Sequence, residues 1–325
     1  MKMHAAVVTS FERSPRYETF ETPTPEGEHE ALVDVLAVGL HPRVRSGASG
    51  AHYTSTGKLP LIPGVDGVGR LPDGKRIYFV ADDSSFGTMA EKAVVDLRRS
   101  VPLPEGVDPV KVAAAMNPAM SSWVALRRRV PLEPGQDVLI LGATGNAGQM
   151  AVQIAKRLGA RRVIGAGRDA GRLRQVEAAG ADAVVSLSED AWSSAAAVAE
   201  AASEVDIVID YLWGKPAEET IPALLTRRSD RGRALNWIQI GAMAGPTIEL
   251  PSVALRSANF RLQGCGQGAV SLRGYLAELQ SLVEGIAAGH LKVSTGAVPL
   301  RDVEAAWTRP VAAGERTVVV MAGRE

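Results

Sequence analysis

Short apolar runs alternate with amphipathic stretches through the middle of the chain. The runs DVLIL, RVIGAG, AVVSL, DIVID and ALNWIQIG are apolar almost throughout. After the first run, apolar residues at helical spacing outline one helix face, namely Ala147, Ala151, Ile154, Ala155 and Leu158. Strands that are apolar on both faces need helices on both sides of their sheet. The pattern therefore predicts an α/β fold with a doubly wound parallel sheet.

The two ends of the chain are patterned differently. Near the start, HAAVV and ALVDVLAVGL predict strands, and the Gly- and Ser-rich segment 46–57 predicts a loop. The segment VKVAAAMNPAMSSWVALRRRV has helical composition, and we expect Pro118 to bend or interrupt that helix. Towards the other end, a mixed pattern contains FRLQGCG, a long helix over 272–288, the strand-like GAVPL, a short helix and TVVVMA.

Composition narrows the class of protein. The chain has 325 residues, of which 46% are hydrophobic, so it is long enough for two globular domains. Its formal net charge is zero, which argues against nucleic acid or an anionic membrane as the main partner. We find neither a signal peptide nor the apolar run of about 20 residues that a membrane span needs. Cys265 is the only cysteine, which excludes a disulfide within the chain and favours a reducing, cytoplasmic location.

The strongest single motif is a glycine loop. In LILGATGNAGQMAVQIAKRLGA, Gly142, Gly145 and Gly148 lie between a predicted strand and a predicted helix. The absent side chains let a pyrophosphate approach the backbone, and the helix N-terminus offers free N–H groups to it. Because a βαβ unit surrounds the motif, we interpret it as a dinucleotide site rather than a merely structural turn.

The end of the second strand indicates which dinucleotide. An NAD site usually carries a carboxylate there for the ribose 2′-hydroxyl, whereas VIGAGRDAGR has Gly167 followed by Arg168. A guanidinium can bind the 2′-phosphate of NADP in a fork, and Arg172 is a second candidate one helical turn further on. Asp169 could instead meet the ribose, but we interpret it as a helix N-cap. The sequence thus favours NADP(H).

Seven segments follow one another along the chain: LIPGVDGVG, GTMAEKAVV, AAAMNPAMSSWVAL, the glycine loop, VDIVIDYLWG, LNWIQIGAMAG and VPLRDVEAAWTRPVAAGERTVVVMA. In their order and spacing they resemble the medium-chain dehydrogenase/reductase family, in its zinc-independent, NADPH:quinone-reductase-like branch. The resemblance implies a Rossmann NADP-binding domain over 120–266. It also implies a mainly β, GroES-like catalytic domain built from 1–119 and 267–325, with the active site in the cleft between the domains. A homodimer through the FRLQGCG edge strand is a further expectation.

The resemblance also addresses metal and mechanism. The positions of the family's catalytic zinc ligands fall on His41, Val65 and Asn117, and valine cannot ligate a metal. The four-cysteine structural zinc lobe is absent. Without a Lewis acid, hydride transfer suits acceptors with their own electron sink, so we expect a quinone or α,β-unsaturated carbonyl substrate. The alternatives are a catalytically silent NADPH-binding sensor or structural protein, and an alcohol or aldehyde dehydrogenase.

The resemblance further implies roles for single residues. Tyr53 or His41 would give the hydrogen bond to the reduced acceptor oxygen, although Tyr53 could equally be a surface aromatic and His41 could make a structural hydrogen bond. Leu212 and Met243 would pack the nicotinamide. The implied cofactor-binding residues are Asn117, Ser121, Thr144, Gly145, Asn146, Ala147, Gly148, Gly167, Arg168, Arg172, Leu212, Gly241, Ala242 and Met243.

Overall fold

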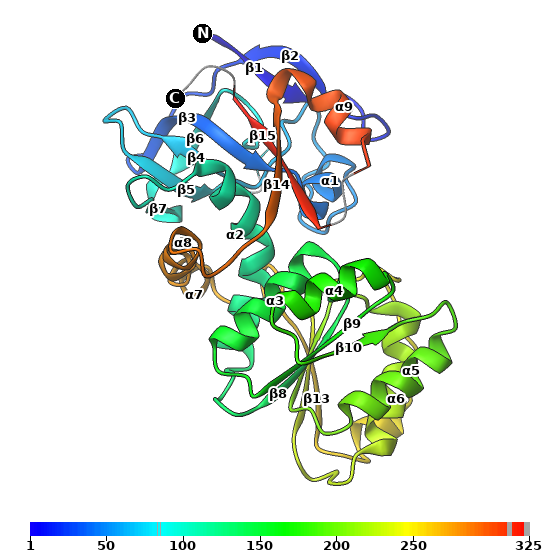
Figure 1. The fold of residues 1–325 in the computed structure, drawn as a ribbon. Coiled ribbons are helices and arrows are strands. Elements are labelled where there is room, and N and C mark those ends of the chain that lie inside the picture. Colours follow the sequence, from blue (N-terminus) through cyan, green and yellow to red (C-terminus); the bar gives the residue numbers. More distant parts are fainter. Residues whose placement is uncertain (83, 85, 311–313, 322–325) are drawn as a thin grey trace. The chain divides into compact units, whose positions relative to one another are not determined.

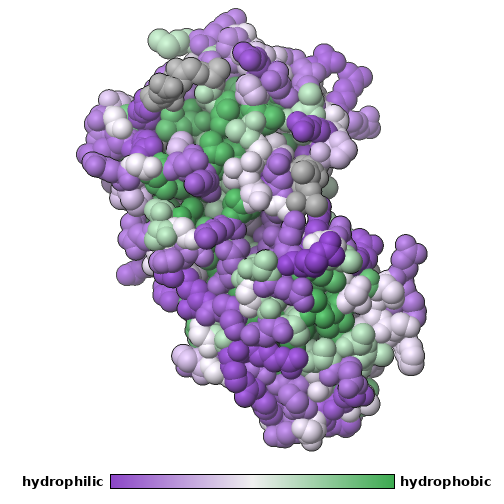
Figure 2. All heavy atoms as spheres, viewed as in Figure 1, coloured by the Kyte–Doolittle hydropathy of each residue, from purple (hydrophilic) through white to green (hydrophobic). Residues whose placement is uncertain are grey.

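The computed structural model describes residues 1–325 except 83, 85, 311–313 and 322–325. The chain forms two compact units (Figure 1). One contains Met1–Asn117 together with the segment from Leu279 onward, and the other is Pro118–Glu278. On the face shown in Figure 2, hydrophilic residues cover most of the surface of each unit, since the apolar side chains fill two separate cores.

The central unit is built on a six-stranded sheet in which every pairing is parallel. The strand order is β10-β9-β8-β11-β12-β13. From β8 the chain first adds strands on one side of the sheet and then, from β11, on the other side, as in a Rossmann fold. The strands are β8 (Asp137–Leu141), β9 (Arg162–Gly167), β10 (Ala183–Ser186), β11 (Ile207–Asp210), β12 (Leu235–Gln239) and β13 (Phe260–Gly264). The prediction of a doubly wound parallel sheet is confirmed.

Helices cover both faces of this sheet, with α3 and α4 on one side and α5 and α6 on the other (Figure 1). Because β8 and β11 are buried at every residue, their apolar runs need that double cover. The helices are α3 (Asn146–Arg157), α4 (Ala170–Ala178), α5 (Ala191–Ala202), α6 (Gly214–Arg227) and the short α7 (Leu272–Leu276), with a 3₁₀ turn at Ser252–Leu255.

The terminal unit holds a seven-stranded, mostly antiparallel sheet and a separate β1-β2 pair. The sheet order is β14-β15-β3-β4-β5-β7, with β6 also paired to β3. Its strands and the pair are β1 (Lys2–Val7), β2 (Arg16–Glu21), β3 (Glu30–Gly39), β4 (Asp66–Arg70), β5 (Arg76–Val80), β6 (Lys92–Asp96), β7 (Ser100–Pro102), β14 (Ser294–Pro299) and β15 (Glu315–Val320). Its helices are α1 (Pro42–Ala48), α8 (Leu279–Ala287) and α9 (Val303–Thr308), with 3₁₀ turns at Leu97–Arg99 and Leu300–Asp302.

Two predicted elements differ from the structure. The 46–57 loop is helical over its first residues, because α1 runs to Ala48 and buries Val44 and Ala48 one turn apart. Pro118 does not interrupt its helix either, since α2 (Pro109–Val124) continues through it into a π-turn at Ala125–Arg129.

The long helix expected over 272–288 is two helices, α7 and α8, separated around Glu278. The Glu278 carboxylate is 1% exposed and accepts hydrogen bonds from Trp123 Nε1 at 2.8 Å, Arg127 Nε at 2.6 Å and Arg128 Nε at 2.5 Å. These bonds tie Glu278 to the central unit, of which it is the last residue.

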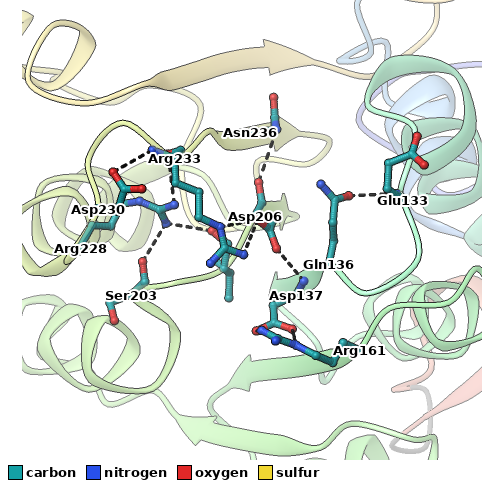
Figure 3. A network of polar contacts seen from close by, with 11 residues as sticks. Glu133, Gln136, Asp137, Arg161, Ser203, Asp206, Arg228, Asp230, Arg233 and Asn236 are labelled. Carbon is teal, nitrogen blue, oxygen red and sulfur yellow. Dashed lines mark hydrogen bonds and ion pairs between the residues drawn. The ribbon is translucent and has the colours of Figure 1, made fainter.

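A polar network closes the amino-terminal end of the parallel sheet (Figure 3). Asp206, just before β11, accepts hydrogen bonds from Arg233 Nε at 2.9 Å and from the Asp137 amide at 2.9 Å. Asp137 in turn accepts a two-pronged pair of bonds from Arg161 at 2.9 and 2.7 Å. The network joins the starts of neighbouring strands, at the end of the sheet opposite to the glycine loop.

Candidate functional site

The glycine loop joins β8 to α3 and leaves no room for a side chain at Gly148. Gly142 has a φ of 83°, in the left-handed region that favours glycine. A β-carbon on Gly148 would lie 2.3 Å from the Gly142 carbonyl oxygen. Gly145 is the N-cap of α3 and has no side chain to bond the first N–H groups of the helix. The loop is thus a backbone cradle at a helix N-terminus, suited to an anion such as a pyrophosphate.

The end of β9 packs directly on this loop. A β-carbon on Gly167 would lie 2.4 Å from Thr144 Cγ2, so only glycine lets the end of β9 approach the loop this closely. Arg168 follows with an exposed side chain. Asp169 caps α4 by accepting the Arg172 amide at 2.9 Å, as the sequence predicted. The buried Arg172 Nε has no hydrogen-bond partner among the described residues and lies 3.9 Å from the Asp169 carboxylate. Two arginines thus follow the end of β9, Arg168 directly and Arg172 in the first turn of α4.

The turn after β11 is strained. Trp213 has a φ of 52°, which for a residue with a bulky side chain costs about 1–3 kcal/mol. The turn is held by the Asp210 carboxylate, whose Oδ1 accepts the amides of Leu212 at 2.8 Å and Trp213 at 2.9 Å. Burial raises the pKa of Asp210 to about 6, and the hydrogen bonds from Trp213, Leu212 and Trp237 oppose that rise.

The segment after β12 is bonded to this turn. The Met243 amide donates to the Tyr211 carbonyl at 3.2 Å, and the Ala244 amide donates to the Leu212 carbonyl at 2.8 Å. A β-carbon on Gly241 would lie 2.8 Å from the Tyr211 carbonyl oxygen. The Met243 side chain is 73% exposed. The structure thus brings Leu212, Gly241 and Met243 together at the carboxyl ends of neighbouring strands.

Asn117 and Ser121 lie four residues apart on α2, hence on one face of that helix. The Ser121 hydroxyl is 3.0 Å from the Tyr211 hydroxyl and donates to the Pro118 carbonyl at 3.0 Å. Burial raises the pKa of Tyr211 to about 12, so this phenol is neutral. Lys215, four residues further on, forms ion pairs with Glu218 and Glu219.

His41 and Tyr53, the two proposed hydrogen-bond donors, lie in different surroundings in the terminal unit. The His41 ring is 1% exposed, with Nε2 3.3 Å from Asp66 Oδ1. Tyr78 donates to the other oxygen of Asp66 at 2.8 Å. The buried Nδ1 of His41 has no hydrogen-bond partner among the described residues. Tyr53 is 71% exposed, and its ring lies against that of His52, tilted by 31° with 4.2 Å between the centroids. The structure does not join His41 and Tyr53 into one group.

A cleft in the terminal unit adjoins the Tyr53 loop. Its lining includes Phe11, Arg43, Val44, Thr54 and Val65. Arg43 Nη2 donates to the Thr54 hydroxyl at 2.6 Å, which ties the loop to α1. The walls thus combine apolar side chains with a guanidinium, hydroxyls and the Asp82 carboxylate, as suits an organic molecule that carries hydrogen-bonding oxygen atoms.

Three further features concern metal ligands, the single cysteine and membrane-spanning helices. Among the described residues, no group of three or more His, Cys, Asp or Glu side chains is arranged to hold a metal ion. Cys265 is buried, and burial raises its thiol pKa to about 11, so it is not a reactive thiolate at neutral pH. Within the same part of the chain, none of the helices has both the length and the apolar character needed to cross a bilayer.

Comparison with known proteins gives consistent matches. Residues 147–281 match the family model described as zinc-binding dehydrogenase. The chain is 31% identical to a probable NADPH-dependent quinone reductase of Emericella nidulans, over 98% of this chain and 100% of that protein. The solved quinone oxidoreductase of Thermus thermophilus, also determined with NADPH, matches with a TM-score of 0.80 at 26% identity, covering 98% and 100% of the two chains. A thermostable alcohol dehydrogenase from Pyrobaculum aerophilum shares the fold, with a TM-score of 0.80 at 24% identity over 98% and 100%.

Sequence reasoning missed Asp210 and the strained Trp213. The available signal was a carboxylate at the carboxyl end of a buried parallel strand, in DIVID. Its partners are two backbone amides and the Trp237 indole, 3.1 Å away. A linear sequence does not reveal such contacts, because backbone donors carry no side-chain signature.

Proposed function

Because the chain belongs to the quinone-reductase-like members of the medium-chain dehydrogenase/reductase family, we propose that it transfers hydride from NADPH to a quinone or an α,β-unsaturated carbonyl compound. The glycine cradle carries this proposal. A β-carbon at Gly148 would meet the backbone of Gly142 and Ala143, so glycine lets α3 begin directly against the loop, and the free N–H groups at the start of α3 support a pyrophosphate site. When bound, NADPH supplies the hydride.

The chain's own residues bind and orient that cofactor. We propose that the backbone of 144–148 holds the pyrophosphate and that Arg168 and Arg172 hold the 2′-phosphate. Asn117, Ser121, Leu212, Gly241, Ala242 and Met243 form the nicotinamide end of the site. Support comes from the hydrogen bonds that join the turn after β11 to the segment after β12. The Tyr211 hydroxyl, 3.0 Å from Ser121, positions that serine.

For the acceptor, we propose the cleft that includes Phe11, Arg43 and Val65, with Tyr53 as hydrogen-bond donor to the oxygen that gains charge. Exposure supports Tyr53, which is 71% exposed and precedes the lining residue Thr54, over His41, whose ring is enclosed and bonded to Asp66. The role of His41 is then structural, in the buried group with Asp66 and Tyr78.

Zinc independence is part of the proposal and rests on the donor set. In the family's ligand positions stand His41, which bonds Asp66, then Val65, which has no donor atom, and Asn117, whose amide is a poor zinc ligand. An alcohol dehydrogenase that depends on zinc would need ligands that these residues do not provide. Quinones and enones delocalise the added electron pair themselves, so positioning and one hydrogen bond suffice.

We also propose a cytoplasmic homodimer. Among the residues that the structure describes, the edge strand β13 pairs with a strand on one side alone, and Val253 and Leu255 just before it are exposed. The buried single cysteine suits a reducing compartment.

The function is tested by following NADPH oxidation at 340 nm with a panel of small quinones and enones. Turnover with at least one acceptor, absent with simple aldehydes, is expected. Tight NADPH binding without turnover on any acceptor would instead favour a silent NADPH-binding protein. Stoichiometric zinc in the purified, active enzyme would contradict the metal-free mechanism.

A further inference from the structure

Asp210 makes an unusual number of hydrogen bonds for one residue. Its Oδ1 accepts from Leu212 and Trp213 amides, and its Oδ2 accepts from Trp237 Nε1 at 3.1 Å. Its carbonyl oxygen accepts the amides of Ile240 at 2.8 Å and Gly241 at 3.1 Å. One fully buried residue thus fixes both the turn after β11 and the start of the segment after β12.

The same turn reaches the glycine loop. A β-carbon on Gly142 would lie 3.1 Å from Leu212 Cδ2, so the Leu212 side chain covers the turn that follows β8. The Leu212 carbonyl accepts the Ala244 amide at 2.8 Å. A strained residue such as Trp213 persists only where its surroundings hold it in place, and here the Asp210 carboxylate accepts its amide. If those bonds weaken, Asp210 no longer holds both Leu212 and the segment 241–244 in place.

Building on the proposed function, we propose that Asp210 is a positioning residue whose ionised carboxylate holds Leu212 and the segment 241–244 in the arrangement that binds the nucleotide, so that protonating Asp210 weakens binding. An ionised carboxylate only accepts hydrogen bonds, whereas a protonated one adds a donor. All three groups that bond this side chain are donors, so a proton on either oxygen opposes at least one of them.

The surroundings of Asp210 allow it to be protonated within the pH range of a binding experiment. Burial raises its pKa to about 6. Its strand neighbours, Leu141 on β8 and Gln239 on β12, are uncharged. From the turn itself, the titratable neighbour is Tyr211, whose hydroxyl bonds Ser121 and whose pKa of about 12 keeps it neutral. A change of charge at Asp210 is therefore not masked by a charged group in these contacts.

The test measures the dissociation constant of NADP⁺ between pH 5 and 8 by isothermal titration calorimetry. Asp210→Asn places an amide donor among donors at every pH, so we expect an approximately tenfold higher dissociation constant at pH 7.5 and a flatter pH profile. The wild-type protein should lose affinity as pH falls through about 6, more steeply than the variant. Titration of the nucleotide's 2′-phosphate near pH 6 is common to all samples and cancels in the comparison.

Asp206→Asn is the matched control, because Asp206 precedes the same strand and belongs to the network at its other end. It should retain the wild-type pH profile. An Asp210→Asn protein with wild-type affinity and profile would overturn this proposal and leave the proposed function standing. A wild-type protein that does not bind NADP⁺ would overturn both.

If Asp210→Asn does not fold, Trp237→Phe removes one donor to the carboxylate and keeps an aromatic ring. Losing a hydrogen bond to the ionised form raises a carboxyl pKa, so the loss of affinity should begin at a higher pH than in the wild type. An unshifted profile in a folded Trp237→Phe protein contradicts the proposal.

Discussion

The carbonyl oxygen of Gly142 occupies the space that a β-carbon would need at Gly148, only 2.3 Å away. Gly148→Ala must push the loop backbone apart, and we expect it to lower the free energy of unfolding by roughly 1–3 kcal/mol and to abolish detectable NADPH binding. Gly145→Ala is the control for packing, because its β-carbon would lie 3.5 Å from the same oxygen, an ordinary contact. It should keep wild-type stability yet bind NADPH at least tenfold more weakly, since the methyl group faces the proposed pyrophosphate. Urea denaturation and calorimetry separate the two effects.

Arg168→Ala should distinguish the two nucleotides. The exposed guanidinium follows Gly167 at the end of β9, where a 2′-phosphate would lie. Loss of one charge-assisted contact of about 1.5 kcal/mol raises the dissociation constant of NADPH about tenfold and leaves that of NADH within twofold. Arg174→Ala, an exposed arginine further along α4, should change neither value. An equal loss for NADPH and NADH would remove Arg168 from the phosphate site.

Tyr53→Phe tests the proposed hydrogen-bond donor. Removing the hydroxyl should lower kcat with a quinone about tenfold, because the developing oxyanion loses its donor, while the KM for NADPH stays unchanged. Tyr17→Phe in β2, where the ring stacks on His4 at 4.9 Å between centroids, is a control away from the proposed acceptor cleft. Turnover unaffected by the Tyr53 change would assign that tyrosine to the loop surface.

Disrupting the network in Figure 3 should lower the stability of the fold without changing the catalytic rate. Asp206 is mostly buried and bonds Arg233 and the Asp137 amide, so Asp206→Asn leaves one charged and one neutral donor poorly matched. We expect a loss of about 2 kcal/mol in the free energy of unfolding and an unchanged kcat at 25 °C. A large fall in kcat in the folded variant would show that this end of the sheet influences the reaction.

The buried His41 should make the free energy of unfolding depend on pH. Burial lowers the pKa of His41 below its ordinary value of 6.5, and the Asp66 carboxylate only partly opposes this. The unfolded chain therefore binds a proton near pH 6.5 that the folded one does not, so stability falls as pH drops below that value. Asp210 has the opposite effect on stability. Because its pKa is about 6 in the folded protein and 3.8 in an ordinary carboxyl, the folded state binds a proton that the unfolded state does not, and stability rises as pH falls from about 6 towards 3.8.

His41→Gln should therefore lose less stability between pH 7 and 5 than the wild type, as measured by urea denaturation at each pH. His29→Gln, at an exposed position, is the control and should follow the wild-type curve. A His41 variant that loses as much stability as the wild type over this range would mean that the imidazole titrates normally in the folded state.

Local chemistry was enough to predict the central architecture and the family. DVLIL and DIVID are apolar at the inner positions and become buried parallel strands, since such runs are stable only between layers of helices. Glycines between strand and helix predict the cradle because the absence of side chains is itself visible in a sequence. Asp169 could be assigned as an N-cap for a similar reason, as its partner lies three residues away.

Contacts between residues far apart in the sequence decided where one predicted helix divides and what two buried polar residues do. The helix predicted over 272–288 divides because Glu278 bonds Trp123 and two arginines about 150 residues earlier in the chain. The roles of His41 and Asp210 likewise depend on Asp66 and Trp237, which the sequence separates from them by 25 and 27 residues. Hydrophobic periodicity is a property of neighbouring residues and can be seen in one dimension. The protonation and orientation of a buried group depend on donors and charges that only folding brings within 3 Å or so.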